Sequence, residues 1–299
     1  MLTIKDISKG FADVQALEQV SLNLEQGSIY GLVGSNGAGK TTLLKLLTGI
    51  YQPDAGEILF QGHQVYENVD VKAKICFIPD DLYFFGQYSV RNMADFYRTV
   101  YPNWNEERFL KLQQVFGLDM HKGLNRLSKG MRRQAAFWLA FSTMPELLVL
   151  DEPLDGLDPV MRQKVKNLLV QEVAERGTSV IISSHNLRDL EDLCDRVGIL
   201  HRGSLILEKG MQDLISTVHK VQVAFSDGVP EAVLKHPGLV FKEERGSVLL
   251  LILRGDRQQI TSELAQYNPV ILDILPLTLE EIFIYEMGDA GYEIRNIVF

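Results

Sequence analysis

Three short stretches of the chain contain runs of consecutive apolar residues, which are typical of strands that are covered on both faces. They are residues 28–33, 147–150 and 178–183. Over residues 2–30, apolar and polar side chains alternate, and this alternation favours antiparallel strands. The pattern therefore predicts an α/β fold with a mostly parallel core sheet and an antiparallel β subdomain.

Apolar residues recur at helical spacing over residues 90–114, and a break at residues 101–104 divides them into two helices. We interpret this stretch as part of a mostly helical insertion between strands, at about residues 87–140. A second helical pattern runs over residues 160–176 and stops at Gly177, a residue type that commonly ends helices.

The C-terminal part, residues 218–299, predicts a small α+β domain. No cluster of catalytic residue types stands out in it, and we expect a role in dimerisation or regulation. Its predicted strands are residues 221–225, 239–242, 248–253 and 270–275, and its predicted helices are residues 257–267 and 279–287.

Composition is that of an ordinary globule, with 46% hydrophobic and 23% charged residues among 299. The net charge of −9 argues against a broad nucleic-acid footprint. No stretch approaches the roughly 18 to 20 consecutive apolar residues of a membrane span. Residues 1–6 lack the basic and apolar regions of a secretion signal, so we expect no secretion. The two cysteines, Cys76 and Cys194, lack metal-ligand spacing, so we expect reduced thiols in a cytoplasmic protein. From the acidic net charge we expect no nucleic-acid partner.

The stretch GSNGAGKTT, residues 34–42, lies between a predicted strand and a helical segment. Strand, glycine-rich loop and helix are the context of a phosphate-binding loop, whose amide groups surround a polyphosphate at the positive end of the helix dipole. Lys40 would reach the β- and γ-phosphates, and Thr41 would bind Mg²⁺. The alternative is a glycine-rich turn that matches the pattern by chance. The predicted nucleotide contacts are Ser35, Asn36, Gly37, Ala38, Gly39, Lys40, Thr41 and Thr42.

Two acids, Asp151 and Glu152, directly follow the apolar stretch 147–150. The carboxyl ends of strands are where ligands bind in open α/β sheets. Asp151 suits Mg²⁺ coordination and Glu152 suits polarising an attacking water, although such pairs are often only turn or helix caps. His185 follows the stretch 178–183 at the same sheet edge, as a hydrogen-bonding group near the γ-phosphate or as a structural residue.

Each of three further features has two possible interpretations. Phe11 precedes the phosphate loop and would either stack on adenine or fill the core at a strand end. Ser128 is placed to cap a helix, and a capped helix start is also an anion site. The aromatic residues 82–88 either pack inward or form a surface for another protein.

Five motifs in this order resemble the nucleotide-binding subunit of an ATP-binding-cassette (ABC) transporter: GSNGAGKTT, LSKGM, LLVLDEP, DGLD and SSH. The resemblance covers residues 1 to about 215 and implies a P-loop ATPase cassette that binds ATP and Mg²⁺. By this resemblance Phe11 is the adenine platform, and Ser128 and Gly130 contact the γ-phosphate held by an opposite subunit. Two cassettes would then pair head to tail.

Two motifs depart from the family pattern. The usual signature LSGGQ is changed by Lys129 and Met131, and Asp80 stands where the family carries a loop glutamine. Asp80 is expected to bind Mg²⁺ through water. Both changes resemble the bacterial drug and antimicrobial-peptide export subfamily, in which the permease is a separate polypeptide.

The resemblance predicts an ATP-hydrolysing subunit that drives a separate transmembrane permease through ATP-dependent dimerisation. Such a subunit would lie on the inner face of the cell membrane, paired with an identical or a different cassette. Two alternatives stay open, a soluble cassette ATPase that acts on ribosomes or DNA, and a regulatory cassette that binds ATP but hydrolyses it weakly.

Overall fold

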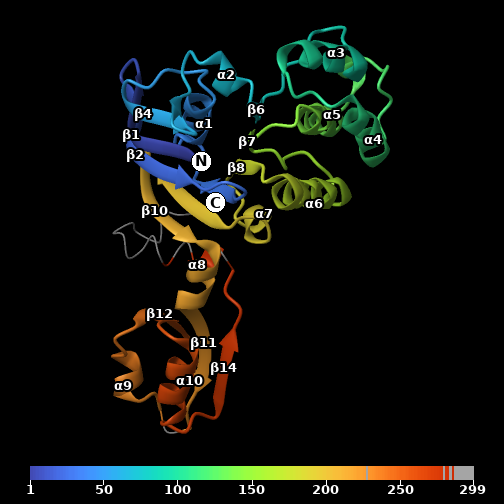
Figure 1. The fold of residues 1–299 in the computed structure, drawn as a ribbon. Coiled ribbons are helices and arrows are strands. Elements are labelled where there is room, and N and C mark those ends of the chain that lie inside the picture. Colours follow the sequence, from blue (N-terminus) through green and yellow to red (C-terminus); the bar gives the residue numbers. More distant parts are fainter. Residues whose placement is uncertain (227, 279, 283–284, 286–299) are drawn as a thin grey trace. The chain divides into compact units, whose positions relative to one another are not determined.

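The computed structural model of the chain describes residues 1–226, 228–278, 280–282 and 285 (Figure 1). The chain forms two compact units, Met1–Glu208 and Lys209–Phe299. Among the described residues, no helix is both long enough and apolar enough to cross a membrane.

A six-stranded sheet is the centre of the first unit. Its strands, in their order across the sheet, are β10 (Ser204–Gly210), β9 (Arg196–His201), β3 (Ile29–Val33), β8 (Ser179–Ser184), β7 (Leu147–Asp151) and β6 (Ile75–Ile78). β3 pairs in parallel with β8 and β9, and β7 pairs in parallel with β6 and β8. Every residue of β3, β7 and β8 is buried, which explains their mostly apolar sequences and confirms the predicted parallel core.

The second sheet of this unit is antiparallel, as the alternating pattern predicts. Its order is β2 (Val14–Leu24), β1 (Leu2–Phe11), β4 (Ala55–Phe60) and β5 (His63–Gln64). The inward side chains of this sheet share one hydrophobic core with α1 (Lys40–Leu47) and with the parallel sheet. This packing holds α1, and with it the glycine-rich loop, against both sheets.

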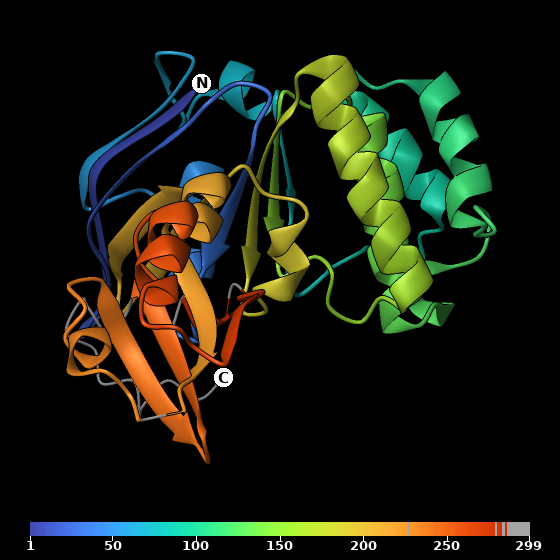
Figure 2. The same ribbon diagram turned by 90° about the horizontal axis from the view of Figure 1, so that it is seen from below.

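Helices gather at one side of the parallel sheet in both views (Figures 1 and 2). The larger ones are α3 (Val90–Val100), α4 (Glu106–Phe116), α5 (Lys129–Ser142) and α6 (Pro159–Arg176). Side chains of Ser89, Asn105, Ser128 and Asp158 accept hydrogen bonds from their first-turn amides. The buried carboxylate of Glu172 on α6 forms ion pairs with arginines of α4 and α6, which ties the predicted insertion to the rest of the unit. The short helices are α2 (Val69–Lys72), η1 (Leu124–Arg126) and α7 (Arg188–Glu191).

The second unit contains an antiparallel sheet and several short helices. The sheet order is β12 (Leu239–Arg245), β13 (Val248–Arg254), β11 (Val218–Ala224) and β14 (Ile271–Leu275), and the helices are α8 (Met211–Thr217), α9 (Glu231–Leu234) and α10 (Arg257–Ala265). Alternate residues of β11 and β13 form its small core with Ile260 and Leu264 of α10. These elements match the α+β pattern, whereas most of the helix predicted over residues 279–287 lies outside the described residues.

Candidate active site

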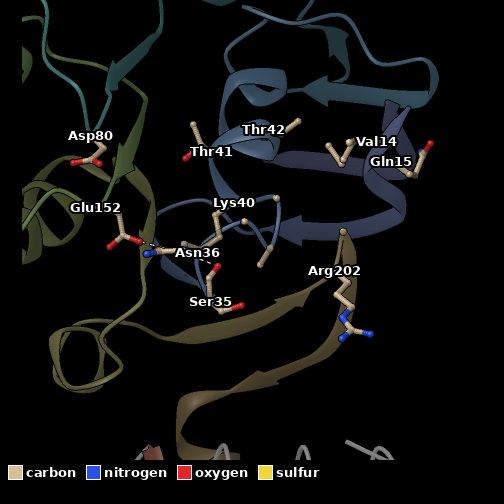
Figure 3. Close-up of a pocket in the computed structure, with 15 residues that line it drawn as sticks. Val14, Gln15, Ser35, Asn36, Lys40, Thr41, Thr42, Asp80, Glu152 and Arg202 are labelled. Carbon is tan, nitrogen blue, oxygen red and sulfur yellow. Dashed lines mark hydrogen bonds and ion pairs between the residues drawn. The ribbon is translucent and has the colours of Figure 1, made fainter. Parts of the chain in front are cut away.

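A pocket of about 350 Å³ opens where β3 ends and α1 begins (Figure 3). All eight predicted nucleotide contacts of the loop, residues 35–42, line it. Asp80 beyond β6, Glu152 beyond β7 and Gln15 of the β1–β2 hairpin complete the wall, together with Arg202. The fold therefore brings five distant parts of the sequence together around one pocket.

Two glycines of the loop are required by protein neighbours as well as by any ligand. Gly39 has a φ of 108°, and a Cβ there would lie 2.6 Å from the carbonyl oxygen of Ala16. A Cβ at Gly34 would collide with the carbonyl oxygen of Leu200. The close packing of this loop onto β2 and β9 therefore sets its shape.

Lys40 is buried and turned toward the loop. Its Nζ donates to the carbonyl oxygen of Gly34 at 2.6 Å and to that of Ser35 at 3.3 Å. The same ammonium lies 3.2 Å from Oε1 of Glu152. One cation thus connects the glycine-rich loop to the acid at the end of β7.

Thr41, which lines the pocket, is hydrogen-bonded to Asp151 at the end of β7. The Thr41 hydroxyl donates to Oδ2 of Asp151 at 2.7 Å, and the Ser183 hydroxyl of β8 donates to Oδ1 at 2.6 Å. Asp151 is buried, so these hydroxyls satisfy a carboxylate that has lost its water. A hydroxyl beside a carboxylate is a set of hard oxygen ligands that fits Mg²⁺.

Glu152 is held in a strained position that directs its side chain into the pocket. Its φ is 44°, in the left-handed region that non-glycine residues rarely occupy. The Ser183 hydroxyl accepts a 3.0 Å hydrogen bond from its amide, while Oε2 accepts one from the amide of His185 at 3.2 Å and lies 2.9 Å from Nδ1 of that residue. Strain at such a position is typical of functional sites.

Asp80 lies at the pocket edge with Glu152, but its carboxylate is already engaged. Oδ1 accepts a 2.9 Å hydrogen bond from Nη2 of Arg133 on α5. About half of the Asp80 side chain is exposed, and the residue lines the pocket with Glu152 (Figure 3).

Ser128 and Gly130, at the start of α5, do not line this pocket. Ser128 caps the helix, and its Oγ accepts a hydrogen bond from the amide of Met131 at 3.2 Å. The cap role of Ser128 is thus present in the structure, and its phosphate role stays a prediction.

Phe11 is not a core residue. It is exposed at the end of β1 and packs edge-on against Tyr51, with ring centroids 5.3 Å apart, under the ammonium of Lys9. It does not line the pocket, whereas Val14 and Gln15 of the same hairpin do. The core interpretation of Phe11 is therefore wrong, and the adenine interpretation stays a prediction.

The aromatic residues 82–88 form a surface. Tyr83, Phe85 and Tyr88 are exposed, and Phe85 lies 5.0 Å from Tyr88 and 5.4 Å from Phe96 of α3 between ring centroids. The core alternative for this segment is thus wrong for its exposed rings. We call Tyr83, Phe85, Tyr88 and Phe96 the aromatic surface.

Sequence reasoning missed three contributors to the site. Ser183 anchors both acids, Arg133 holds Asp80, and Asp155 brings a carboxylate oxygen within 4.8 Å of ligand atoms of Glu152 and His185. A polar residue inside a buried strand was a usable signal for Ser183. Arg133 gave none, because charged residues are common on helices.

A family model described as "ABC transporter" matches residues 17–155. The "ABC transporter ATP-binding protein YtrB" of Bacillus subtilis is 34% identical over 288 residues, which cover 96% of this chain and 98% of that protein. The "Bacitracin transport ATP-binding protein BcrA" of Bacillus licheniformis is 31% identical over 206 residues, covering 68% of this chain and 67% of the relative.

A solved structure of an "ATP binding subunit of ABC transporter" superposes with a TM-score of 0.67 at 26% identity, covering 72% of this chain and 91% of the other. The fold, the pocket at the glycine-rich loop and the relatives agree. The chain therefore belongs to the ABC transporter family, in which it is an ATP-binding subunit with an ATPase cassette.

Proposed function

We propose that the chain hydrolyses ATP to drive a separate transmembrane permease that exports drugs or antimicrobial peptides. The observation that carries the catalytic part is the meeting of β7 with the glycine-rich loop, where Thr41 contacts Asp151 at 2.7 Å and Lys40 lies 3.2 Å from Glu152. The cargo class rests on the similarity to a bacitracin transport protein.

ATP binds with its phosphates among the loop amides, at the N-terminus of α1. Thr41 and Asp151 would hold Mg²⁺, which neutralises charge on the phosphates when it is bound. The phosphate oxygens compete with the carbonyl groups of Gly34 and Ser35 for the Lys40 ammonium. A Lys40 ammonium that binds the phosphates would also leave its 3.2 Å contact with Glu152.

Glu152 then orients the attacking water and accepts its proton, while the water oxygen bonds to the γ-phosphorus and the bond to ADP breaks. His185 holds Oε2 of Glu152 from the amide and from Nδ1, so that the carboxylate keeps one orientation. The products are ADP and inorganic phosphate.

A second cassette completes each site. Ser128 and Gly130 start α5 outside the pocket of their own chain, so a γ-phosphate contact from them requires another copy or another cassette. The aromatic surface is our candidate for the permease contact, because aromatic residues are enriched where proteins meet. This contact would keep the chain on the inner face of the membrane.

The test is Glu152→Gln, which keeps the shape of the side chain and removes the base. We expect ATP hydrolysis to fall by about 100-fold or more, with ATP affinity retained. Glu146→Gln is the matched control, because this half-buried acid precedes the same strand at its other end. Equal phosphate release by Glu152→Gln and the unaltered chain would remove Glu152 from this role.

A further inference from the structure

Arg133 of α5 is a fully buried charge whose contacts all point to one loop. Nη1 donates to the carbonyl oxygen of Pro79 at 2.9 Å, and Nη2 donates to the carbonyl oxygen of Asp80 at 3.0 Å. Nη2 also donates to Oδ1 of Asp80 at 2.9 Å. Arginine is rarely buried this completely without an acid, and in the described part of the chain Asp80 is the only acid that forms an ion pair with it.

The Asp80 carboxylate is held on one side and open on the other. Oδ1 faces Arg133, whereas Oδ2 has no hydrogen-bond partner among the described residues. About half of the side chain, 51%, is exposed, and the residue lines the nucleotide pocket beside Glu152 (Figure 3). The open oxygen is therefore available to water at the pocket edge.

Charge gives a second reason for the pairing. The pocket receives polyphosphate, and it already has the carboxylates of Asp151 and Glu152 near it. A third free carboxylate at its edge would repel the ligand. Arg133 offsets that charge from behind, without entering the pocket itself, and its planar fork sets the direction of the carboxylate as a single ammonium does not.

We propose that Arg133 is a positioning residue, which fixes the Asp80 carboxylate so that Oδ2 accepts a hydrogen bond from a water of the bound Mg²⁺ and ATP. The inference rests on the proposed function, and it adds a role for a residue outside the pocket. It also accounts for the short side chain at position 80, because the clamp holds both the backbone and the carboxylate of this residue.

The experiment measures binding of a fluorescent, non-hydrolysable ATP analogue to the full chain during a MgCl₂ titration. We expect Asp80→Asn and Arg133→Met each to raise the Mg²⁺ concentration of half-maximal binding by about 10-fold, the lower end of the effect of a metal's outer-shell partners. The double variant should match the single variants, because Arg133 acts through Asp80.

Asp81→Asn is the matched control, since Asp81 is exposed and has no ion pair in the described part of the chain. It should keep the unaltered Mg²⁺ midpoint. If Arg133→Met lowers only the thermal unfolding midpoint and leaves the Mg²⁺ midpoint unchanged, Arg133 is merely structural and the proposal is overturned. Effects that multiply in the double variant overturn it as well.

Arg133→Lys decides the question if Arg133→Met does not fold, because lysine keeps the charge and loses the fork. A raised Mg²⁺ midpoint supports the clamp, and an unaltered one overturns it. A chain that binds the analogue but never hydrolyses ATP would refute the proposed function instead. The Mg²⁺ titration still tests Arg133 in that case, since it requires no turnover.

Discussion

At Gly130, the absence of a side chain lets the signature segment, residues 127–131, pack closely against another loop. A Cβ at this position would lie 2.6 Å from the carbonyl oxygen of Gly156, in the loop that follows β7. The resemblance to ABC cassettes explains Gly130 by phosphate contact alone. The structure adds a packing reason within the chain, because the first turn of α5 passes directly over this carbonyl.

Replacing Gly130 by alanine should therefore destabilise the cassette, by about 1–3 kcal/mol for forced overpacking. The thermal unfolding midpoint measures the effect. Gly86→Ala is the control, because nothing lies within 4 Å of a Cβ there and its φ is not in the left-handed region. An alanine at 130 that unfolds at the same temperature as the unaltered chain would show that the 154–158 loop moves away without cost.

At the scale of elements, the aromatic surface allows the membrane contact to be tested separately from ATP hydrolysis. It lies within residues 83–96, none of which lines the nucleotide pocket. The double variant Tyr83→Ala and Phe85→Ala should leave ATP hydrolysis by the purified chain unchanged. It should lower the fraction of tagged chain that sediments with membranes, because a lost aromatic anchor typically costs an interface about 2 kcal/mol or more.

Tyr267→Ala is the matched control for this measurement, since Tyr267 is also an exposed aromatic but belongs to the second unit. It should sediment as the unaltered chain does. Unchanged sedimentation of the double variant would exclude the aromatic surface as the membrane partner's contact.

At the scale of the whole molecule, the separation of Ser128 from the pocket predicts assembly. The Glu152→Gln chain, which binds ATP without turnover, should become a dimer in ATP and stay a monomer without it. Adding Ser128→Arg should abolish the dimer, because a bulky cation would occupy the contact with the opposite γ-phosphate. Light scattering after gel filtration measures both states.

Ser262→Arg controls for the added charge, since Ser262 is an exposed serine of α10 in the second unit. A chain that stays monomeric in ATP, yet dimerises on mixing with a different cassette, would replace the homodimer by a heterodimer. A dimer that forms regardless of Ser128→Arg would place the contact elsewhere.

Local pattern was sufficient for much of the fold. The apolar stretches of the sequence coincide with the buried strands β3, β7 and β8. The predicted N-cap Ser128 precedes α5, and the predicted stop Gly177 follows α6. These features depend on neighbouring residues, so they can be read without knowing the tertiary structure. The alternatives for Phe11 could not be decided in this way, because exposure of a ring depends on what the rest of the chain covers.

The sequence by itself determined the family motifs, the class of fold and the residue types of a phosphate site. Only the tertiary structure decided which of these residues meet. Thr41 and Asp151 are 110 positions apart, and Asp80 and Arg133 are 53 apart. Their contacts follow from the strand order and from burial of α5, which are set by packing of the whole unit and leave no local pattern.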